Sequence, residues 1–321
     1  MKKLLPKRTA AVLLSLAMAL SLAACSTPAP DPSTSSGDSE QPYVLQMEIS
    51  QDDWNDNRQY VELSTGITMS YVEMGVEDGP ALILQHGMTD NSRVWSLSAP
   101  YFAAAGYHVY MPDLRGHGYS DQPDTGMYTV SDFAADLNAF MEAKGIEKAD
   151  MVGHSLGSMT MQAFLLLYPE RCNSVTLVAS TPVSPDALGT DYYSYSLGLG
   201  DDEHPDDEFM SAWYTNPNPV DEEFLGYVMQ ESQQLSAASW RAISAGAAVE
   251  DLRPFYPFIS DSVPLMIVHG SLDGFFNDES QQELLSYLPW ATYKVYDGIG
   301  HNVQYEIPEQ FAADVIDFIA P

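Results

Sequence analysis

Basic residues are scarce in this chain of 321 residues. It has 13 lysines and arginines against 45 aspartates and glutamates, which gives a formal net charge of −32. Proteins that bind nucleic acid neutralise phosphates with a basic surface, so the composition argues against nucleic acid as a partner. Acidity of this kind is usually a solubility feature, and it indicates no particular substrate.

Long apolar runs are also missing. The run from Ala10 to Ala24 is too short to span a bilayer. It follows a basic start made of Lys2, Lys3, Lys7 and Arg8. A basic start before a short apolar stretch is typical of a secretory signal, so the sequence predicts a signal peptide over residues 1–24 and export of the protein.

The end of this signal reads Leu22-Ala23-Ala24-Cys25, which resembles the lipobox of bacterial lipoproteins. In that family the cysteine is lipidated and becomes the first residue of the mature chain. The resemblance implies anchoring through Cys25 to the extracytoplasmic face of a bacterial membrane, held stably if two or more acyl chains are attached. Ordinary secretory cleavage beside an incidental cysteine is the alternative.

Cysteine is limited to Cys25 and Cys172. With Cys25 lipidated, no intramolecular disulfide can form, so stability must come from the core. We expect Cys172 to be a small buried apolar residue.

The segment 25–42 is rich in Ser, Thr, Pro, Asp and Gly and is predicted to be a flexible linker. Residues 43–321 are enough for one large domain.

Apolar strands alternate with amphipathic helical stretches along residues 43–321. Strands are predicted at 59–64, 67–73, 81–85, 107–112, 148–153, 174–179, 265–269 and 292–296, and helices at 94–105, 130–144, 279–287 and 308–320, besides one after residue 155. Continuous apolar strands between such helices indicate an α/β fold, with a mostly parallel central sheet and helices on both faces.

The stretch between two predicted strands, from about 181 to 262, is too long for an ordinary connection. It has helical patches near 207–214, 221–232 and 237–248, and its aromatic residues argue against a disordered loop. We expect an inserted helical cap that roofs a site and selects substrates. An acidic cluster, Asp201 to Glu208, lies within it.

Gly153-His154-Ser155-Leu156-Gly157 lies between an apolar run and a helical stretch. A G-x-S-x-G pattern in this context is typical of a nucleophile elbow, a strained turn that projects the serine from the end of a sheet. A plain glycine-rich loop with a passive serine is the alternative.

A serine hydroxyl needs a base, and the base needs an orienting acid. His301 follows the last predicted strand, where open α/β sheets place functional groups. Asp273 follows the preceding strand, which gives the order serine, acid, histidine. Asp278, Asp261 and Asp251 are less well placed alternatives for the acid.

An oxyanion needs preorganised N–H donors, one of them from the residue after the nucleophile, here Leu156. The second should come from a loop after an earlier strand. His86-Gly87-Met88 fits, with Met88 as the amide donor and His86 and Gly87 as loop support. A simple strand-ending turn is the alternative.

Together these residues resemble the α/β-hydrolase superfamily, from about Gly79 to Pro321. Asp113-Leu114-Arg115-Gly116-His117-Gly118-Tyr119-Ser120 adds the family's structural turn. The resemblance implies hydrolysis of an acyl substrate through an acyl-serine, with Ser155 as nucleophile, His301 as base and Asp273 as its partner. Serine at the elbow argues against the family's epoxide hydrolases and haloalkane dehalogenases, which use aspartate there. Candidate pocket residues besides Met88 are Trp95, Trp213, Tyr214, Phe275 and Phe276, each of which could equally be core.

The leading hypothesis is a membrane-tethered carboxylic-ester hydrolase for a small-molecule acyl substrate, with no cofactor. The same triad serves C–C bond hydrolases, lactonases, aminopeptidases and perhydrolases. A peptidase would need acidic groups for a free amine, which Asp201 to Glu208 could supply. A lipid-anchored binding protein without catalysis is the alternative from another class.

No metal site is predicted, because the loop from Asp52 to Asn57 lacks the turn glycine and final glutamate of a calcium site.

Overall fold

A computed structural model of the protein describes residues 45–123, 127–185 and 190–320. The predicted signal peptide, Cys25 and the linker lie outside the described residues. Their assignments therefore stay predictions.

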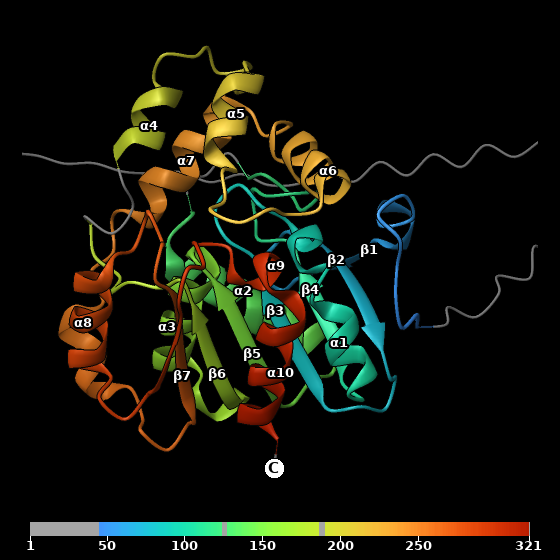
Figure 1. Ribbon diagram of the computed structural model, residues 1–321, viewed down its shortest axis with the longest axis vertical. Coiled ribbons are helices and arrows are strands. Elements are labelled where there is room, and N and C mark those ends of the chain that lie inside the picture. The colour runs from blue at the N-terminus through green and yellow to red at the C-terminus, as the bar shows by residue number, and fades with distance from the viewer. Residues whose placement is uncertain (1–44, 124–126, 186–189, 321) are drawn as a thin grey trace, which may run out of the picture. The chain divides into compact units, whose positions relative to one another are not determined.

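An eight-stranded sheet runs through the domain in the order β1-β2-β4-β3-β5-β6-β7-β8 (Figure 1). The pairs β1/β2 and β2/β4 are antiparallel, and the other neighbouring strands are parallel. The strands are β1 (Gln59–Glu62), β2 (Thr68–Gly75), β3 (Ala81–Gln85), β4 (His108–Pro112), β5 (Ala149–His154), β6 (Cys172–Val178), β7 (Leu265–Gly270) and β8 (Thr292–Tyr296). The predicted mostly parallel sheet is confirmed.

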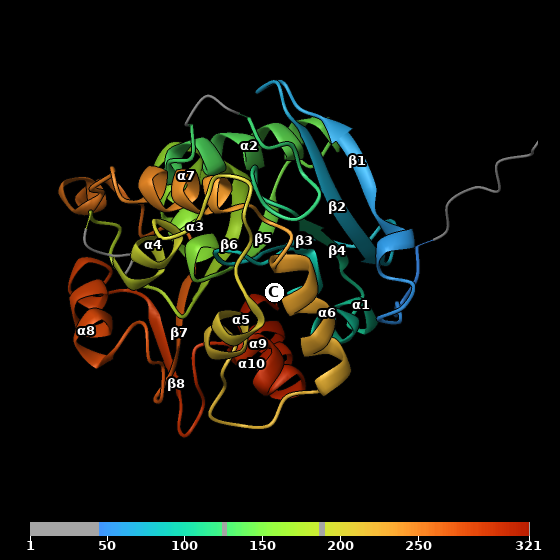
Figure 2. The ribbon, with the colours of Figure 1, turned by 90° about the horizontal axis from the view of Figure 1, so that it is seen from above.

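Helices cover both faces of this sheet, as the view from above shows (Figure 2). One face carries α2 (Val130–Ala143) and α3 (Leu156–Leu167), which pack against each other. The other carries α1 (Ala99–Ala104) and α10 (Pro308–Ile319), also in mutual contact. The strands β4, β5 and β7 are buried along their whole length, which is why their sequences are largely apolar rather than alternating. The predicted α/β class is confirmed.

The helix expected over 94–105 is divided in the structure. A 3-10 helix, η2 (Ser92–Trp95), precedes α1, which begins at Ala99. Pro100 lies in the first turn of α1. A proline has no N–H to donate and is therefore favoured at a helix start. The helical pattern of the sequence is continuous here, so it did not indicate that α1 begins only at Ala99.

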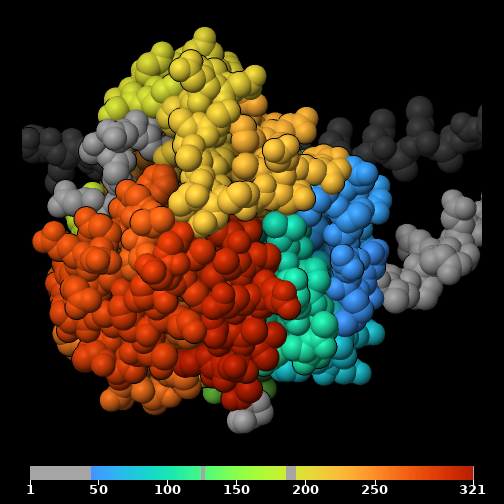
Figure 3. Space-filling model, in the orientation of Figure 1, coloured from blue at the N-terminus to red at the C-terminus, as the bar shows by residue number. Residues whose placement is uncertain are grey.

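Between β6 and β7 the chain forms α4 (Thr190–Ser196), α5 (Asp207–Trp213), α6 (Glu222–Ser232), α7 (Ala237–Ala247) and the 3-10 helix η4 (Arg253–Phe258). The helices expected near 207–214, 221–232 and 237–248 are confirmed, whereas α4 and η4 were not foreseen. We call α4 to α7 the cap. It lies above the sheet in Figure 1, and the yellow atoms of α5 and α6 rest on the core in Figure 3.

Two further helices lie in the C-terminal part, α8 (Asp278–Tyr287) and the short α9 (Val303–Glu306). Cys172 is buried, as expected. Within the described ranges, no helix combines the length and apolar character that a bilayer crossing needs.

Candidate active site

Ser155 lies at a sharp turn between β5 and α3. Its backbone has φ 51° and ψ −117°, a conformation that a residue with a Cβ adopts only under strain. Both flanking glycines are required sterically. A Cβ on Gly153 would stand 2.4 Å from the Gly157 carbonyl oxygen, and a Cβ on Gly157 would stand 2.4 Å from the Gln85 carbonyl oxygen. The geometry expected of an elbow is therefore present, with Ser155 in front of the α3 N-terminus.

His301 contacts Asp273 across two neighbouring strand ends. The Nδ1 atom of His301 lies 3.0 Å from Oδ1 and 2.9 Å from Oδ2 of Asp273. The backbone N–H groups of Phe275 and Phe276 also donate to Oδ1. Burial alone would raise the pKa of Asp273, but His301 and these donors outweigh it, so the pKa lies below its ordinary value. Asp273 is held as a carboxylate that orients the His301 ring.

Of the other three acids considered, Asp261 is exposed, and the remaining two are engaged elsewhere. Asp251 forms an ion pair with Arg253 at 2.7 Å. Asp278 is the first residue of α8 and lies 3.2 Å from the Nε2 atom of His269, with its side chain exposed. Of the acids considered, Asp273 is the one that contacts His301.

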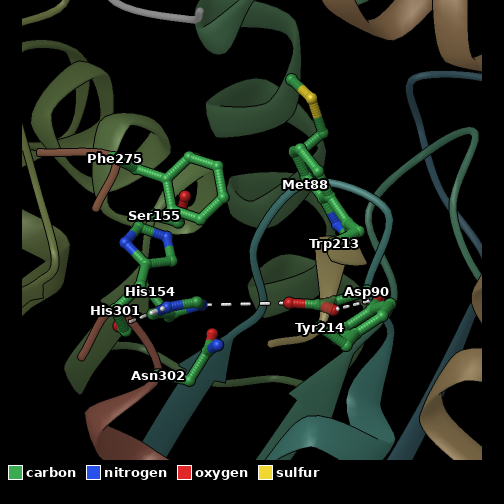
Figure 4. Close-up of a pocket in the computed structure, with 9 residues that line it drawn as sticks. All are labelled: Met88, Asp90, His154, Ser155, Trp213, Tyr214, Phe275, His301 and Asn302. Atoms are coloured by element: carbon green, nitrogen blue, oxygen red, sulfur yellow. Dashed lines mark hydrogen bonds and ion pairs between the residues drawn. The ribbon is translucent and has the colours of Figure 1, made fainter. Parts of the chain in front are cut away.

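Ser155 and His301 line one pocket, and the close-up shows the His301 ring beside the serine side chain (Figure 4). The serine is 7% exposed. Its hydroxyl makes no hydrogen bond to another described residue. Proton transfer requires the hydroxyl and the ring to come within hydrogen-bonding distance, which catalytic sites often reach only with substrate bound.

The loop after β3 carries Met88, whose amide was expected to be the second donor. The backbone N–H groups of Met88 and Leu156 donate no hydrogen bond to another described residue. Buried His86 holds this loop, because its Nδ1 contacts the Gly87 carbonyl oxygen at 2.7 Å and its Nε2 accepts from the Leu114 N–H at 2.9 Å. Burial lowers the pKa of His86 to about 3, so its ring is neutral.

The cap closes the pocket through two adjacent aromatic residues at the end of α5. The Trp213 indole donates to the Thr89 hydroxyl at 3.1 Å. The Tyr214 hydroxyl donates to Oδ1 of Asp90 at 2.8 Å. Thr89 itself has φ 67°, so the loop that carries Met88 is strained as well. The cap therefore contacts the strained loop directly beside the proposed oxyanion donor.

Nine side chains surround a cavity of about 30 Å³. They are Met88, Asp90, His154, Ser155, Trp213, Tyr214, Phe275, His301 and Asn302. The space next to Ser155 admits only a small group in this conformation.

Two of the predicted pocket residues are wrong. Trp95 is fully buried and stacks on Phe311 of α10 at 6.3 Å between ring centroids, so it belongs to the core. Phe276 does not line the pocket either. It lies edge-on against the His301 ring, 5.5 Å between centroids, and is itself buried. Met88, Trp213, Tyr214 and Phe275 do line the pocket, as the sequence predicted.

Sequence reasoning missed Asp90, His154 and Asn302 as pocket residues. His154 was seen only as a neighbour of the serine, yet its Nε2 lies 3.1 Å from the His301 carbonyl oxygen. A carbonyl oxygen only accepts, so Nε2 carries the proton of this ring. Their positions in the sequence could have identified them, because each of the three lies within two positions of Met88, Ser155 or His301.

Residues 80–308 match the sequence family described as the alpha/beta hydrolase fold. The chain belongs to this family. This alpha/beta hydrolase is 27% identical over 285 residues to a non-heme chloroperoxidase of Streptomyces lividans, which covers 81% of this chain and 98% of that protein. It is 30% identical over 164 residues to epoxide hydrolase A of Mycobacterium tuberculosis, covering 51% of this chain and 49% of that protein.

Among solved structures, the alpha/beta hydrolase resembles the enol-lactonase from Burkholderia xenovorans LB400 with a TM-score of 0.70 and 20% identity. The match covers 82% of this chain and 100% of that one. Other relatives are named carboxylesterase and enol-lactonase, and the chain is a hydrolase of this superfamily. The relatives carry names of different reactions, so the substrate must be argued from this chain's own site.

In the part of the chain that the structure describes, no group of three or more His, Cys, Asp or Glu side chains is arranged to hold a metal ion.

Proposed function

We propose that this alpha/beta hydrolase cleaves a carboxylic ester, or a similar acyl substrate, through an acyl-serine intermediate. The contact of Asp273 with His301, in the pocket that Ser155 also lines, carries the proposal. A nucleophile, a base and an orienting acid then meet at one edge of the sheet, each from the end of a different strand.

In the proposed reaction, the Ser155 oxygen attacks the substrate carbonyl while the Nε2 atom of His301 takes its proton. The bond to the leaving group breaks, and His301 gives that proton to the departing oxygen. His301 then removes a proton from water, which attacks the acyl carbon. The bond from this carbon to the Ser155 oxygen breaks, His301 returns the proton to that oxygen, and the acid leaves with Ser155 restored. Asp273 holds Nδ1 protonated throughout, which leaves Nε2 free to act as the base.

The negative oxygen formed in each half of this reaction needs donors. The N–H groups of Met88 and Leu156, which donate to no other described residue, are the proposed oxyanion hole. Removal of one such donor typically costs a factor of about 10²–10³ in turnover. A binding protein without catalysis has no use for free amides and a buried Asp–His pair beside a strained serine, so the arrangement favours an enzyme.

The serine at position 155 also decides which of the reactions named among the relatives fit this chain. The family's epoxide hydrolases use aspartate at the elbow, so epoxide opening is disfavoured here. The names enol-lactonase and non-heme chloroperoxidase among the similar proteins keep lactone hydrolysis and perhydrolysis as alternatives. C–C bond hydrolysis and peptide hydrolysis use the same triad and stay alternatives too.

The test is a panel of p-nitrophenyl esters of increasing acyl length, run beside lactones and aminoacyl naphthylamides. Because the cavity is about 30 Å³, short acyl chains are expected to give the highest kcat/KM. Ser155→Ala should remove turnover while the circular dichroism spectrum stays unchanged. Retained ester turnover in a folded Ser155→Ala variant would overturn the proposal.

We also propose that this reaction takes place outside the cytoplasm, on a membrane anchor. The support is the basic start, the apolar run and the lipobox-like Leu22-Ala23-Ala24-Cys25. The acidic segment 25–42 would then act as a spacer between the lipid and the domain.

A further inference from the structure

Two hydrogen-bond acceptors face each other across the pocket without a donor between them. Nε2 of His154 donates to the His301 carbonyl oxygen, so Nδ1 of the same ring is an acceptor. That Nδ1 is buried and has no hydrogen-bond partner among the residues that the structure describes. Oδ2 of Asp90 lies 3.9 Å away, too far for a direct hydrogen bond. Figure 4 shows the two side chains pointing toward one another from opposite walls.

Each acceptor is nine-tenths buried or more, with His154 2% exposed and Asp90 5% exposed. Burial raises the pKa of Asp90 to about 7, although the Tyr214 hydroxyl and the Gly87 amide donate to it. Burial lowers the pKa of His154 well below its ordinary value, so this ring does not supply a positive charge. The charge of His301 also lowers the pKa of Asp90, but no lysine or arginine of the described residues forms an ion pair with this carboxyl.

The rest of the pocket favours a cation over an anion. None of its lining residues is a lysine or an arginine, whereas Trp213, Tyr214 and Phe275 present aromatic side chains. Aromatic faces attract ammonium groups. The chain as a whole carries a net charge of −32, which draws cations toward its clefts.

The two acceptors border the nucleophile. A methyl group on Gly87 would stand 3.0 Å from Nδ1 of His154, 3.1 Å from Cβ of Ser155 and 3.3 Å from Oδ2 of Asp90. All three groups thus surround the same small space. A ligand group held by Asp90 and His154 would sit next to the carbonyl that Ser155 attacks.

We propose that Asp90 and His154 form a subsite for a protonated amino group, so that the substrate is an ester or amide with an ammonium group on the carbon next to the scissile carbonyl. This rests on the proposed function, since Ser155 performs the same acyl transfer. The acidic cap cluster, the sequence-based candidate for binding an amine, is exposed at Asp201, Asp202 and Glu203 and does not line this pocket.

The experiment uses two 2-naphthyl esters of equal size, the L-alanine ester and the isobutyrate ester, in which a methyl group replaces the ammonium. The full chain in detergent should hydrolyse the alanine ester with a kcat/KM at least about tenfold higher, the worth of one charge-assisted hydrogen bond. Asp90→Asn should reduce this ratio at least about tenfold, because an amide pairs with ammonium far less well. Asp202→Asn, an exposed carboxyl on the cap, is the matched control and should keep the wild-type ratio.

If the wild-type protein hydrolyses the alanine ester with a kcat/KM no higher than that for the isobutyrate ester, the proposed subsite is wrong. Turnover of the isobutyrate ester in that case still supports the proposed function. If the wild-type protein hydrolyses neither ester, the proposed subsite is also wrong. If Ser155 in addition fails to react with a fluorophosphonate, the proposed function is wrong as well.

A second measurement covers the case in which Asp90→Asn does not fold. L-Alaninol should slow fluorophosphonate labelling of wild-type Ser155, whereas isobutanol, its methyl counterpart, should not. Equal effects of the two alcohols contradict an ammonium subsite.

Discussion

Arg93 and Glu231 are 138 residues apart in sequence and form a buried bidentate ion pair. Nε and Nη2 of Arg93 donate to the two carboxylate oxygens of Glu231 at 3.0 Å and 2.6 Å. Arg93 lies in η2, just after the loop that carries Met88, and Glu231 lies in cap helix α6. The Asn91 amide also donates to Glu231. The pair fixes the cap to the part of the core that borders the pocket.

Glu231→Ala is therefore expected to destabilise the protein strongly, because it leaves Arg93 buried without its partner. Breaking a buried pair in this way costs about 3–5 kcal/mol. The free energy of unfolding in urea measures it. Asp251→Asn breaks the partly exposed pair with Arg253 and is the control, with an unchanged midpoint expected. Similar midpoints for the two variants would show that the pair does not hold the cap.

Asp273→Asn should lower kcat on the order of 10⁴-fold, because an amide in contact with Nδ1 favours the wrong tautomer of His301. Steady-state kinetics with the best ester of the panel measures the loss. Asp278→Asn, on the neighbouring helix α8, should change kcat little, since that side chain contacts His269 instead. A larger defect in Asp251→Asn than in Asp273→Asn would move the role of the acid to Asp251.

Stability should fall as the pH falls below about 6.5, the ordinary pKa of histidine. Burial lowers the pKa of His86 and His117 to about 3, and lowers that of His154 as well. Between pH 6.5 and 3 the unfolded chain therefore binds protons at His86 and His117 that the native state does not, and His154 acts in the same direction. Asp90, with a pKa raised to about 7, and Asp150, whose pKa burial also raises, act in the opposite direction, but they are two groups against three.

Each net proton corresponds to a slope of about 1.4 kcal/mol per pH unit in the free energy of unfolding. Urea unfolding between pH 5 and pH 7 measures the slope. His117→Phe keeps a ring beside Phe133 and should reduce the slope by about one proton. An unchanged slope in this variant would contradict the neutral buried histidine.

Cys25→Ala should release the protein from membranes in a bacterial host, because the lipidated sulfur is the proposed anchor. Fractionation followed by immunoblotting measures the distribution. Cys172→Ala removes the other, buried cysteine and should leave the protein in the membrane fraction. Membrane association of Cys25→Ala would point to a different anchor.

Chain order and strand ends were enough to predict which residues meet in the site. Ser155, Asp273 and His301 each follow an apolar strand, and the carboxyl ends of parallel strands share one edge of the sheet. The glycines at 153 and 157 predicted the turn, since no side chain fits at either position. These features are local in sequence or fixed by the sheet, so they can be read without coordinates.

The walls of the pocket could not be predicted in the same way. Asp90 reaches the pocket because Thr89 has a positive φ, and no sequence pattern marks a threonine in that conformation. Trp95 follows the same strand as Met88 but turns into the core through the short helix η2. Composition does not distinguish an aromatic residue that faces solvent or substrate from one that faces the core.

The central claim is that Ser155 is an activated nucleophile. Reaction with a fluorophosphonate, followed by peptide mass spectrometry, tests it most directly. The folded wild-type protein should carry one adduct, on Ser155, and Ser155→Ala should carry none. A folded wild-type protein with no adduct, or with its adduct on a different residue, would contradict the account.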